Sequence, residues 1–264
     1  MNLNEMKLFL FDMDGTLYLG DRLFDFTKEL LQIIKNRGSR YIFVTNNSSK
    51  SVSAYVEKLK KMGIEATEED FFTSSQATAW YLKQNHPGKT LYVCGTNSLK
   101  EELKKEGFTL TEDPDATECI VMGFDTELTF QKLHDVSKLL CTRDLPYIAT
   151  NPDYVCPTEF GSVPDCGSVC DMLFNVSGKR PLVVGKPQPL MAQLAMQKWG
   201  VNPEHTVVVG DRIYTDIKSG LNAGCNTILV MSGETTYDIL QASDDKPHLV
   251  MDSAQMILTA LKET

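Results

Sequence analysis

The stretch Leu8–Leu17, with the sequence LFLFDMDGTL, joins an uncharged apolar run directly to two aspartates and a glycine. The run over 8–11 predicts a strand that is buried on both faces, as in parallel sheets covered by helices. Asp12 and Asp14 follow at its end, where buried carboxylates cost free energy unless a cation or several donors compensate them. In open α/β sheets, ligands bind at this carboxyl end of the strands. We therefore interpret the stretch as part of a functional site.

The composition indicates an ordinary globular chain and excludes several other classes. The 264 residues are 42% hydrophobic and 23% charged, with a formal net charge of −9. This acidic balance argues against a nucleic-acid partner, and no apolar run reaches the roughly 18 residues of a membrane span. Seven cysteines, spread from Cys94 to Cys225, favour reduced thiols over a disulfide framework. Because no secretory signal is visible either, we expect a cytoplasmic protein without nucleic-acid or membrane partners.

Apolar strands and amphipathic helices alternate along both ends of the chain. Strands are expected over 41–44, 182–184, 206–210 and 227–230, and helices over 23–36, 52–62, 189–199, 212–222 and 253–262. Such alternation with short links predicts a doubly wound parallel sheet of the α/β class.

The middle of the chain carries a second set of alternating elements. About 140 residues separate Thr45 from Lys186, whereas a βαβ crossover needs only about 30, and Lys186 lies one such crossover before Asp211. We predict a core over 1–80 and 181–264, interrupted by an inserted α/β cap domain over 81–180 that covers the site as a lid. The loop over 151–167 follows a strand and is a candidate for substrate contact, the alternative being a structural or dimer-forming loop.

Polar side chains stand at the ends of four separate apolar strands. They are Asp12 with Asp14, Thr45 with Asn46, Lys186, and Asp211 with Asp216. Each alone is ordinarily a turn residue, a helix cap or a solvated charge. Together, at one edge of a parallel sheet, they suit a phosphate monoester, a dianion whose transfer is catalysed by positioning and charge stabilisation.

The carboxylates predict a metal site and the catalytic groups. We expect Asp12 and Asp211, with the backbone carbonyl of Asp14, to hold Mg²⁺, which prefers oxygen ligands. Asp12 is then the nucleophile that forms an aspartyl phosphate, and Asp14 is the general acid and base.

The remaining strand ends predict the phosphate-binding groups. We expect the Thr45 hydroxyl and the Asn46 backbone N–H to hold the phosphoryl oxygens. Lys186 supplies them with a positive charge.

The four motifs resemble those of the haloacid dehalogenase (HAD) superfamily. They are FDMDGTL over 11–17, VTN over 44–46, GKP over 185–187 and GDRIYTD over 210–216. The long insert resembles the C2 cap class. TNNS over 45–48 and ATNPD over 149–153, together with GKP, look like the NagD-like, p-nitrophenyl phosphatase branch.

This resemblance implies an Mg²⁺-dependent phosphatase. It gives Asp12 as nucleophile, Asp14 as acid and base, and Asp12, Asp14 and Asp211 as metal ligands, with Asp216 as a carboxylate just outside them. Members of this branch often dimerise through the cap, so a homodimer is also implied.

Small phosphate monoesters, such as sugar phosphates, nucleotides or phosphoglycolate, are the expected substrates. Two alternatives stay open: a regulatory or binding module in which Asp12 accepts a phosphoryl group as a signal, and a phosphomutase. The large insert favours the hydrolase over both, and receiver-like modules are about half this length.

Overall fold

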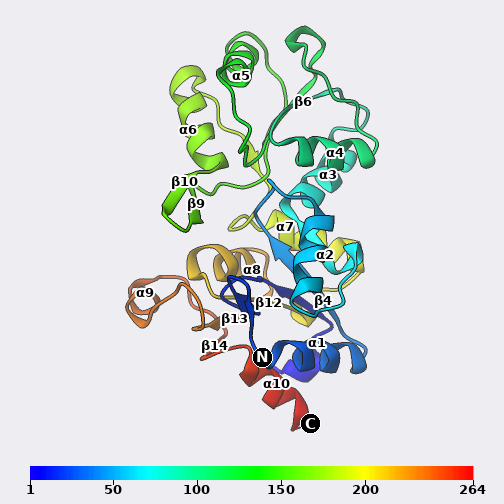
Figure 1. Ribbon diagram of the computed structural model, residues 1–264, viewed down its shortest axis with the longest axis vertical. Helices are drawn as coiled ribbons and strands as arrows, with labels where there is room; N and C mark the ends of the chain where they lie inside the picture. Colours follow the sequence, from blue (N-terminus) through cyan, green and yellow to red (C-terminus); the bar gives the residue numbers. More distant parts are fainter. Residues whose placement is uncertain (264) are drawn as a thin grey trace. The chain divides into compact units, whose positions relative to one another are not determined.

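The computed structural model describes residues 1–263 and separates into two compact units (Figure 1). The core unit contains Met1–Thr45, Val52–Phe72 and the chain from Lys186 onward, and the cap unit contains Asn46–Ser51 and Thr73–Gly185. The chain therefore passes between the units after Thr45, Ser51, Phe72 and Gly185. The predicted domain bounds, with an inserted cap domain over 81–180, stay a prediction.

The core unit is built on a six-stranded sheet with the order β14-β13-β12-β1-β4-β5. The strands are β1 (Leu8–Phe11), β4 (Arg40–Thr45), β5 (Phe71–Thr73), β12 (Thr206–Gly210), β13 (Asn226–Val230) and β14 (Leu249–Met251). Strand β1 pairs in parallel with both β12 and β4, so that Leu10 lies between Val208 and Ile42. Strands β13 and β14 continue the parallel pairing beyond β12. The expected doubly wound parallel sheet is confirmed. The strand expected over 182–184 is the exception, because it pairs within the cap unit and not with the core sheet.

Helices cover both faces of this sheet, which explains why every residue of β1 is buried. Phe9 and Phe11 share an apolar cluster with residues of α1 (Thr27–Asn36), α2 (Val52–Lys61) and α10 (Gln255–Lys262). On the opposite face, Leu10 lines a small cavity with Met191 of α7 (Leu190–Trp199) and with Ser219 of α8 (Lys218–Asn222). Because successive side chains of β1 point to opposite faces of the sheet, Phe9 and Phe11 pack on one face and Leu10 on the other.

Two expected core helices begin differently from the prediction. The first, expected over 23–36, begins at Thr27, because Leu23 belongs to a short hairpin of β2 (Tyr18–Leu19) and β3 (Arg22–Leu23). Leu23 nevertheless packs against the core cluster, which is why the apolar period continued through it. The helix expected over 212–222 opens with a π-helical segment, Ile213–Ile217, before α8.

The cap unit has its own parallel sheet with the order β11-β8-β7-β6. Its strands are β6 (Leu91–Cys94), β7 (Cys119–Met122), β8 (Tyr147–Ala149) and β11 (Leu182–Val183). Helices α5 (Phe130–Thr142) and α6 (Cys166–Ser177) lie on one side of it, and α3 (Ser74–Asn85) and α4 (Asn97–Lys105) on the other (Figure 1).

Four further elements lie where the sequence predicted none. The loop over 151–167 contains an antiparallel hairpin of β9 (Val155–Thr158) and β10 (Gly161–Pro164). The others are α9 (Tyr237–Ala242) and β14 near the end of the core unit. Among residues 1–263, no helix combines the length and the apolar character that a membrane crossing requires.

Candidate active site

Two neighbouring core strands each end on an aspartate. Asp12 follows β1 and Asp211 follows β12, and the paired residues Phe11 and Val209 place these ends side by side. The backbone N–H of Asp12 still donates to the carbonyl of Val209 at 2.8 Å, so the ladder fixes Asp12 up to its own peptide. Both carboxylates therefore leave the sheet at the same edge.

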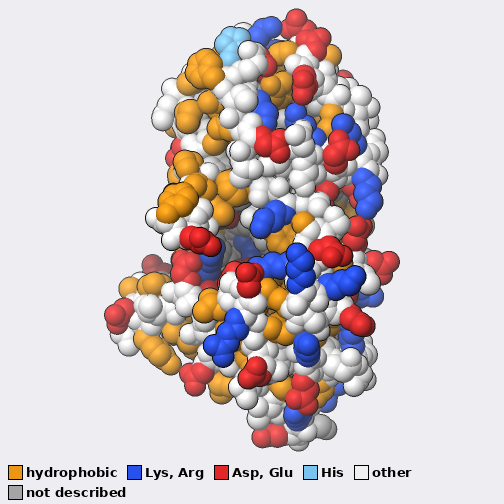
Figure 2. Space-filling model, viewed as in Figure 1, with side chains coloured by type: hydrophobic (Ala, Val, Ile, Leu, Met, Phe, Trp, Pro, Cys, Tyr) orange, Lys and Arg blue, Asp and Glu red, His pale blue; other side chains and the backbone are white. Residues whose placement is uncertain are grey.

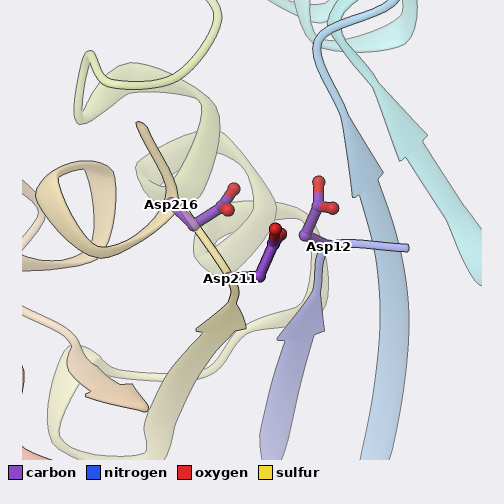
Figure 3. A group of neighbouring side chains, drawn as sticks. All are labelled: Asp12, Asp211 and Asp216. Carbon is purple, nitrogen blue, oxygen red and sulfur yellow. The ribbon is translucent and has the colours of Figure 1, made fainter. Parts of the chain in front are cut away.

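A third carboxylate joins them from the π-helical segment after β12. Oxygen atoms of Asp12, Asp211 and Asp216 lie within 4.8 Å of one another, and Figure 3 shows the three side chains turned toward one space. Asp211 is 3% exposed and Asp216 is 1% exposed. Burial, with the charges of Asp12 and Asp216, raises the pKa of Asp211 to about 7. Such a cluster of acids requires a cation.

Lys186 supplies one positive charge to the cluster. Its Nζ donates to Asp12 Oδ1 at 2.7 Å, to Asp216 Oδ1 at 2.6 Å and to the carbonyl of Val44 at 3.2 Å. Burial lowers the pKa of this ammonium, but the carboxylates of Asp12 and Asp216 outweigh burial and raise it. Lys186 is therefore held charged between two of the three acids.

Asp211 keeps one oxygen without a partner. Its Oδ2 accepts the backbone N–H of Glu234 at 2.7 Å, whereas its buried Oδ1 has no hydrogen-bond partner within residues 1–263. Both oxygens of Asp216, in contrast, accept hydrogen bonds, from Lys186 and from the Arg212 backbone N–H. A buried acceptor without a donor is costly, which suits a bound cation at Asp211 Oδ1.

Two glycines shape the wall around the Asp211 carboxylate. A Cβ on Gly233 would lie 2.0 Å from Asp211 Oδ2, and a Cβ on Gly15, whose φ is +80°, would lie 2.5 Å from the same atom. Ser232 Oγ ties these two backbone segments together by donating to the carbonyl of Gly15 at 2.7 Å. Only residues without a Cβ fit at these two positions.

The other predicted site residues are held by contacts of their own. The side chain of Asp14 is exposed, and its Oδ1 accepts the backbone N–H of Gly20 at 3.2 Å. Thr45 is half-buried at the end of β4, on the side of β1 opposite β12. Asn46 is the first residue of the cap unit, where its side-chain amide contacts Asp153.

The segment after β13 also lines the site, although none of its residues was predicted to belong there. Besides holding Asp211 through its backbone, Glu234 pairs with Arg212 at 2.8 Å and accepts the hydroxyl of Tyr214. The available signal was that Met231-Ser232-Gly233-Glu234 follows another apolar strand of the same sheet. Its end therefore reaches the same edge as Asp12 and Asp211.

Comparison with known proteins identifies this arrangement. Residues 9–109 match the family model of haloacid dehalogenase-like hydrolases, and residues 183–256 match a second, HAD-hydrolase-like model. A 5'-nucleotidase, YutF of Bacillus subtilis, is 35% identical over 94% of this chain and 95% of its own length. An acid sugar phosphatase of Staphylococcus haemolyticus is 33% identical over 97% of each chain.

Solved structures agree with these matches. A 4-nitrophenylphosphatase from Thermotoga maritima superposes with a TM-score of 0.93, at 37% identity over 98% of both chains. NagD from E. coli K-12 superposes with a TM-score of 0.87, at 31% identity over 96% of this chain and 97% of NagD.

The chain belongs to the haloacid dehalogenase-like hydrolase family. Within that family it lies in the branch of NagD and the p-nitrophenyl phosphatases, and it is a phosphoric monoester hydrolase. The family and the class of enzyme expected from the motifs are both confirmed.

Proposed function

We propose that this phosphatase hydrolyses small phosphorylated metabolites with Mg²⁺ and through an aspartyl phosphate on Asp12. One observation carries the metal assignment: the unpartnered, buried Oδ1 of Asp211 beside the carboxylate of Asp12. The ammonium of Lys186 pairs with Asp12 and Asp216 but not with Asp211, so a further cation at Asp211 would balance the three carboxylates.

The residues present fit a hard divalent cation. Asp12, Asp211 and the backbone carbonyl of Asp14 would hold it, whereas Asp216, with both oxygens already hydrogen-bonded, would support Lys186 from outside. When bound, Mg²⁺ supplies charge compensation that lets an anionic phosphate approach anionic Asp12.

The chemistry itself belongs to side chains of this protein. A carboxylate oxygen of Asp12 attacks phosphorus and forms the acyl phosphate, while the bond from phosphorus to the ester oxygen breaks. Asp14, exposed on the loop after β1, gives a proton to the leaving oxygen. It then takes a proton from the water molecule that attacks phosphorus, which releases inorganic phosphate and restores Asp12.

Three groups would hold the phosphoryl oxygens during both steps. They are the hydroxyl of Thr45, the backbone N–H of Asn46 and the ammonium of Lys186. Thr45 is the last residue of β4, Asn46 is the first residue of the cap unit, and Lys186 is the first residue of the chain that returns to the core unit. Lys186 would also keep Asp12 ionised and oriented toward the substrate, since its Nζ donates to Asp12 Oδ1 at 2.7 Å.

The substrates are proposed from the relatives. Those named 5'-nucleotidase and acid sugar phosphatase indicate nucleotides and sugar phosphates, and phosphoglycolate has the same monoester chemistry. In keeping with seven free cysteines, we place the enzyme in the cytoplasm.

We also propose a homodimer formed through the cap unit. Several large apolar side chains of the β9–β10 hairpin and α6 are exposed, with Phe160 at 81%, Val176 at 58% and Met172 at 50%. Figure 2 shows apolar side chains gathered over this part of the cap. Light scattering on a size-exclusion column is expected to give twice the 29.5 kDa chain mass, and Phe160→Ser to shift it toward the monomer.

The test of the catalytic proposal is phosphate release from p-nitrophenyl phosphate, with and without Mg²⁺. Wild-type protein is expected to need the ion, and Asp12→Asn to lose turnover. Asp25→Asn, an exposed acid outside the cluster, serves as the matched control. Full turnover by Asp12→Asn rules out the nucleophile, and a long-lived phosphoaspartate in the wild type supports the regulatory alternative. A panel of phosphorylated metabolites then ranks the substrates.

A further inference from the structure

The side chain of Asn46 is fixed inside the cap unit. Its Nδ2 donates to both carboxylate oxygens of Asp153, at 3.1 and 3.2 Å. Its backbone carbonyl accepts the hydroxyl of buried Ser74 at 2.6 Å. Asn46 is 8% exposed, and hydrogen bonds to an ionised carboxylate are stronger than neutral ones. The residue that follows the predicted phosphate ligand Thr45 is therefore held at both its side chain and its backbone.

Asp153 is itself held in place by its surroundings. Its Oδ2 accepts from Asn151 Nδ2 at 3.3 Å, and its carbonyl accepts the backbone N–H of Gly167 at 2.8 Å. A Cβ on Gly167 would lie 2.2 Å from the carbonyl oxygen of Pro152, so this close approach needs glycine. The fully buried Asn151 also donates to Asp165, the N-cap of α6, at 3.2 Å. Asp153 is thus anchored to the first turn of a helix.

The return segment to the core passes the same cluster. A Cβ on Gly185 would lie 2.6 Å from the carbonyl oxygen of Thr150, 2.7 Å from Asn46 Oδ1 and 3.1 Å from the Cα of Asn151. Gly185 precedes Lys186 directly in the chain. The segment that leaves the core after Thr45 and the segment that returns at Lys186 therefore pack against each other, on residues held by Asp153.

We propose that Asp153 is a positioning residue for phosphate binding. By holding the Asn46 amide, it fixes the peptide that joins Thr45 to Asn46, and through the packing of Asn46 on Gly185 it fixes the backbone that leads to Lys186. Asp153 acts on the phosphoryl ligands and has no direct role at the metal ligands, because the strand ends of β1 and β12 hold Asp12 and Asp211. This inference rests on the proposed roles of Thr45, Asn46 and Lys186.

The experiment compares Asp153→Ala, Asp153→Asn and Asn46→Ala with wild type. The readouts are kcat and KM for p-nitrophenyl phosphate, inhibition by inorganic phosphate and by orthovanadate, and the Mg²⁺ concentration that gives half-maximal activity. Asp153→Ala is expected to lose roughly 10- to 100-fold in kcat, as a misplaced positioning group does. Inhibition by both anions should weaken in parallel, while the Mg²⁺ requirement stays unchanged. Asp153→Asn keeps one acceptor for Asn46, so its kcat is expected to lie between those of wild type and Asp153→Ala.

A double-mutant cycle tests whether Asp153 acts through Asn46. Asp153→Ala combined with Asn46→Ala is expected to be no worse than the more damaged single variant, since both remove the same contact. Losses that add in the double variant overturn the proposal. Should Asp153→Ala fail to fold, the same cycle is run with Asp153→Asn.

Asp135→Asn is the matched control for loss of a buried cap carboxylate. Asp135 is 9% exposed and accepts from Tyr92 and Gln131, at 3.0 and 2.8 Å, away from the crossing segments. Asp135→Asn is expected to lower thermal stability without changing inhibition by phosphate or orthovanadate. If Asp135→Asn weakens this inhibition as much as Asp153→Ala does, the proposal is overturned. The Asp12→Asn variant distinguishes failure of this inference from failure of the proposed function. If Asp12→Asn is inactive and Asp153→Ala behaves as wild type, only this inference is rejected. If Asp12→Asn is active, the proposed function is rejected.

Discussion

The ammonium of Lys186 lies 2.6 Å from the carboxylate of Asp216, and their side chains are only 6% and 1% exposed. Because the same ammonium also contacts Asp12, this one cation lies between two acids of a three-acid cluster. Breaking a buried ion pair by removing one partner is far more costly than replacing the whole pair, since it leaves an uncompensated charge.

Lys186→Met is therefore expected to lower the free energy of unfolding by about 3–5 kcal/mol at pH 8. The loss should be smaller at pH 5.5, because the pKa of Asp211 is raised to about 7 and that of Asp216 to about 6, and acids without a cation take up protons more readily still. Urea unfolding at the two pH values measures this. Lys218→Met, which removes an exposed lysine, is the control. Equal stability of Lys186→Met and wild type at pH 8 would contradict the ion-pair interpretation.

Asp211→Asn is expected to abolish stabilisation by Mg²⁺. A ligand that binds the folded state alone raises stability by about 2.7 kcal/mol at a hundred times its dissociation constant. Wild-type protein should therefore melt at a higher temperature as Mg²⁺ is added and lose this gain with EDTA. In the variant an amide replaces the carboxylate whose Oδ1 lacks a partner, so the shift should disappear. Asp25→Asn should respond as the wild type does, and an undiminished Mg²⁺ shift in Asp211→Asn would remove it from the metal site.

The sequence predicted the elements that bury a continuous apolar surface. Strand β1 is uncharged and wholly buried, so its apolar run was sufficient. The convergence of Asp12 and Asp211 followed from the shared edge of a parallel sheet and needed no strand order. Lys186 reaches Asp12 by another route, because the strand before it, β11, belongs to the sheet of the cap unit. An aspartate directly after an apolar run predicts a position in the folded protein only because parallel strands of this fold class end at one edge of the sheet.

Elements with little buried surface left no such signal. All four residues of β9 are at least partly exposed, and α9 has no buried residue, so neither shows an apolar period. The contact of Asn46 with Asp153 joins residues 107 positions apart in the chain. Asp153 belongs to the ATNPD motif, but nothing local in the sequence indicates that Asn46, directly after Thr45, contacts it within the cap unit.

Gly233→Ala is expected to impair the metal site much more than a change at the neighbouring glutamate. The added Cβ would lie 2.0 Å from Asp211 Oδ2, so the Asp211 carboxylate or the backbone must move. We expect the Mg²⁺ concentration for half-maximal activity to rise roughly tenfold or more, a loss of at least about 1.4 kcal/mol in ion binding. Steady-state assays across an Mg²⁺ titration measure it.

Glu234→Gln is the matched control, because the backbone N–H that holds Asp211 is retained. It removes the partly exposed ion pair with Arg212, whose side chain is 37% exposed, and such pairs contribute little. Its Mg²⁺ requirement should stay near that of wild type. A larger effect in Glu234→Gln than in Gly233→Ala would mean that the side chain, and not the glycine wall, orders this loop.

Asp165 is expected to make the stability of the protein fall as pH rises from about 4 to about 6. Burial, together with the charge of Asp153, raises its pKa from 3.8 to about 6, against the opposing hydrogen bonds from Cys166 and Asn151. The folded state then binds a proton more tightly than the unfolded state, so folding is favoured below the unfolded pKa and that advantage is lost as pH rises through the folded one. A shift of about two pKa units corresponds to at most about 3 kcal/mol.

The Asp165→Asn variant isolates this contribution, because asparagine caps a helix but does not ionise in this range. Urea unfolding at pH 4, 5, 6 and 7 should show the stability of Asp165→Asn rising relative to wild type by about 2 kcal/mol between pH 4 and pH 6, and by only a few tenths of a kcal/mol more up to pH 7. Other carboxylates, Asp211 and Asp216 included, are common to both proteins and cancel in the difference. Asp113→Asn, which changes the exposed cap of a 3-10 turn, should leave that difference flat. A flat difference for Asp165→Asn would mean that its carboxyl is ionised in the folded protein throughout this range.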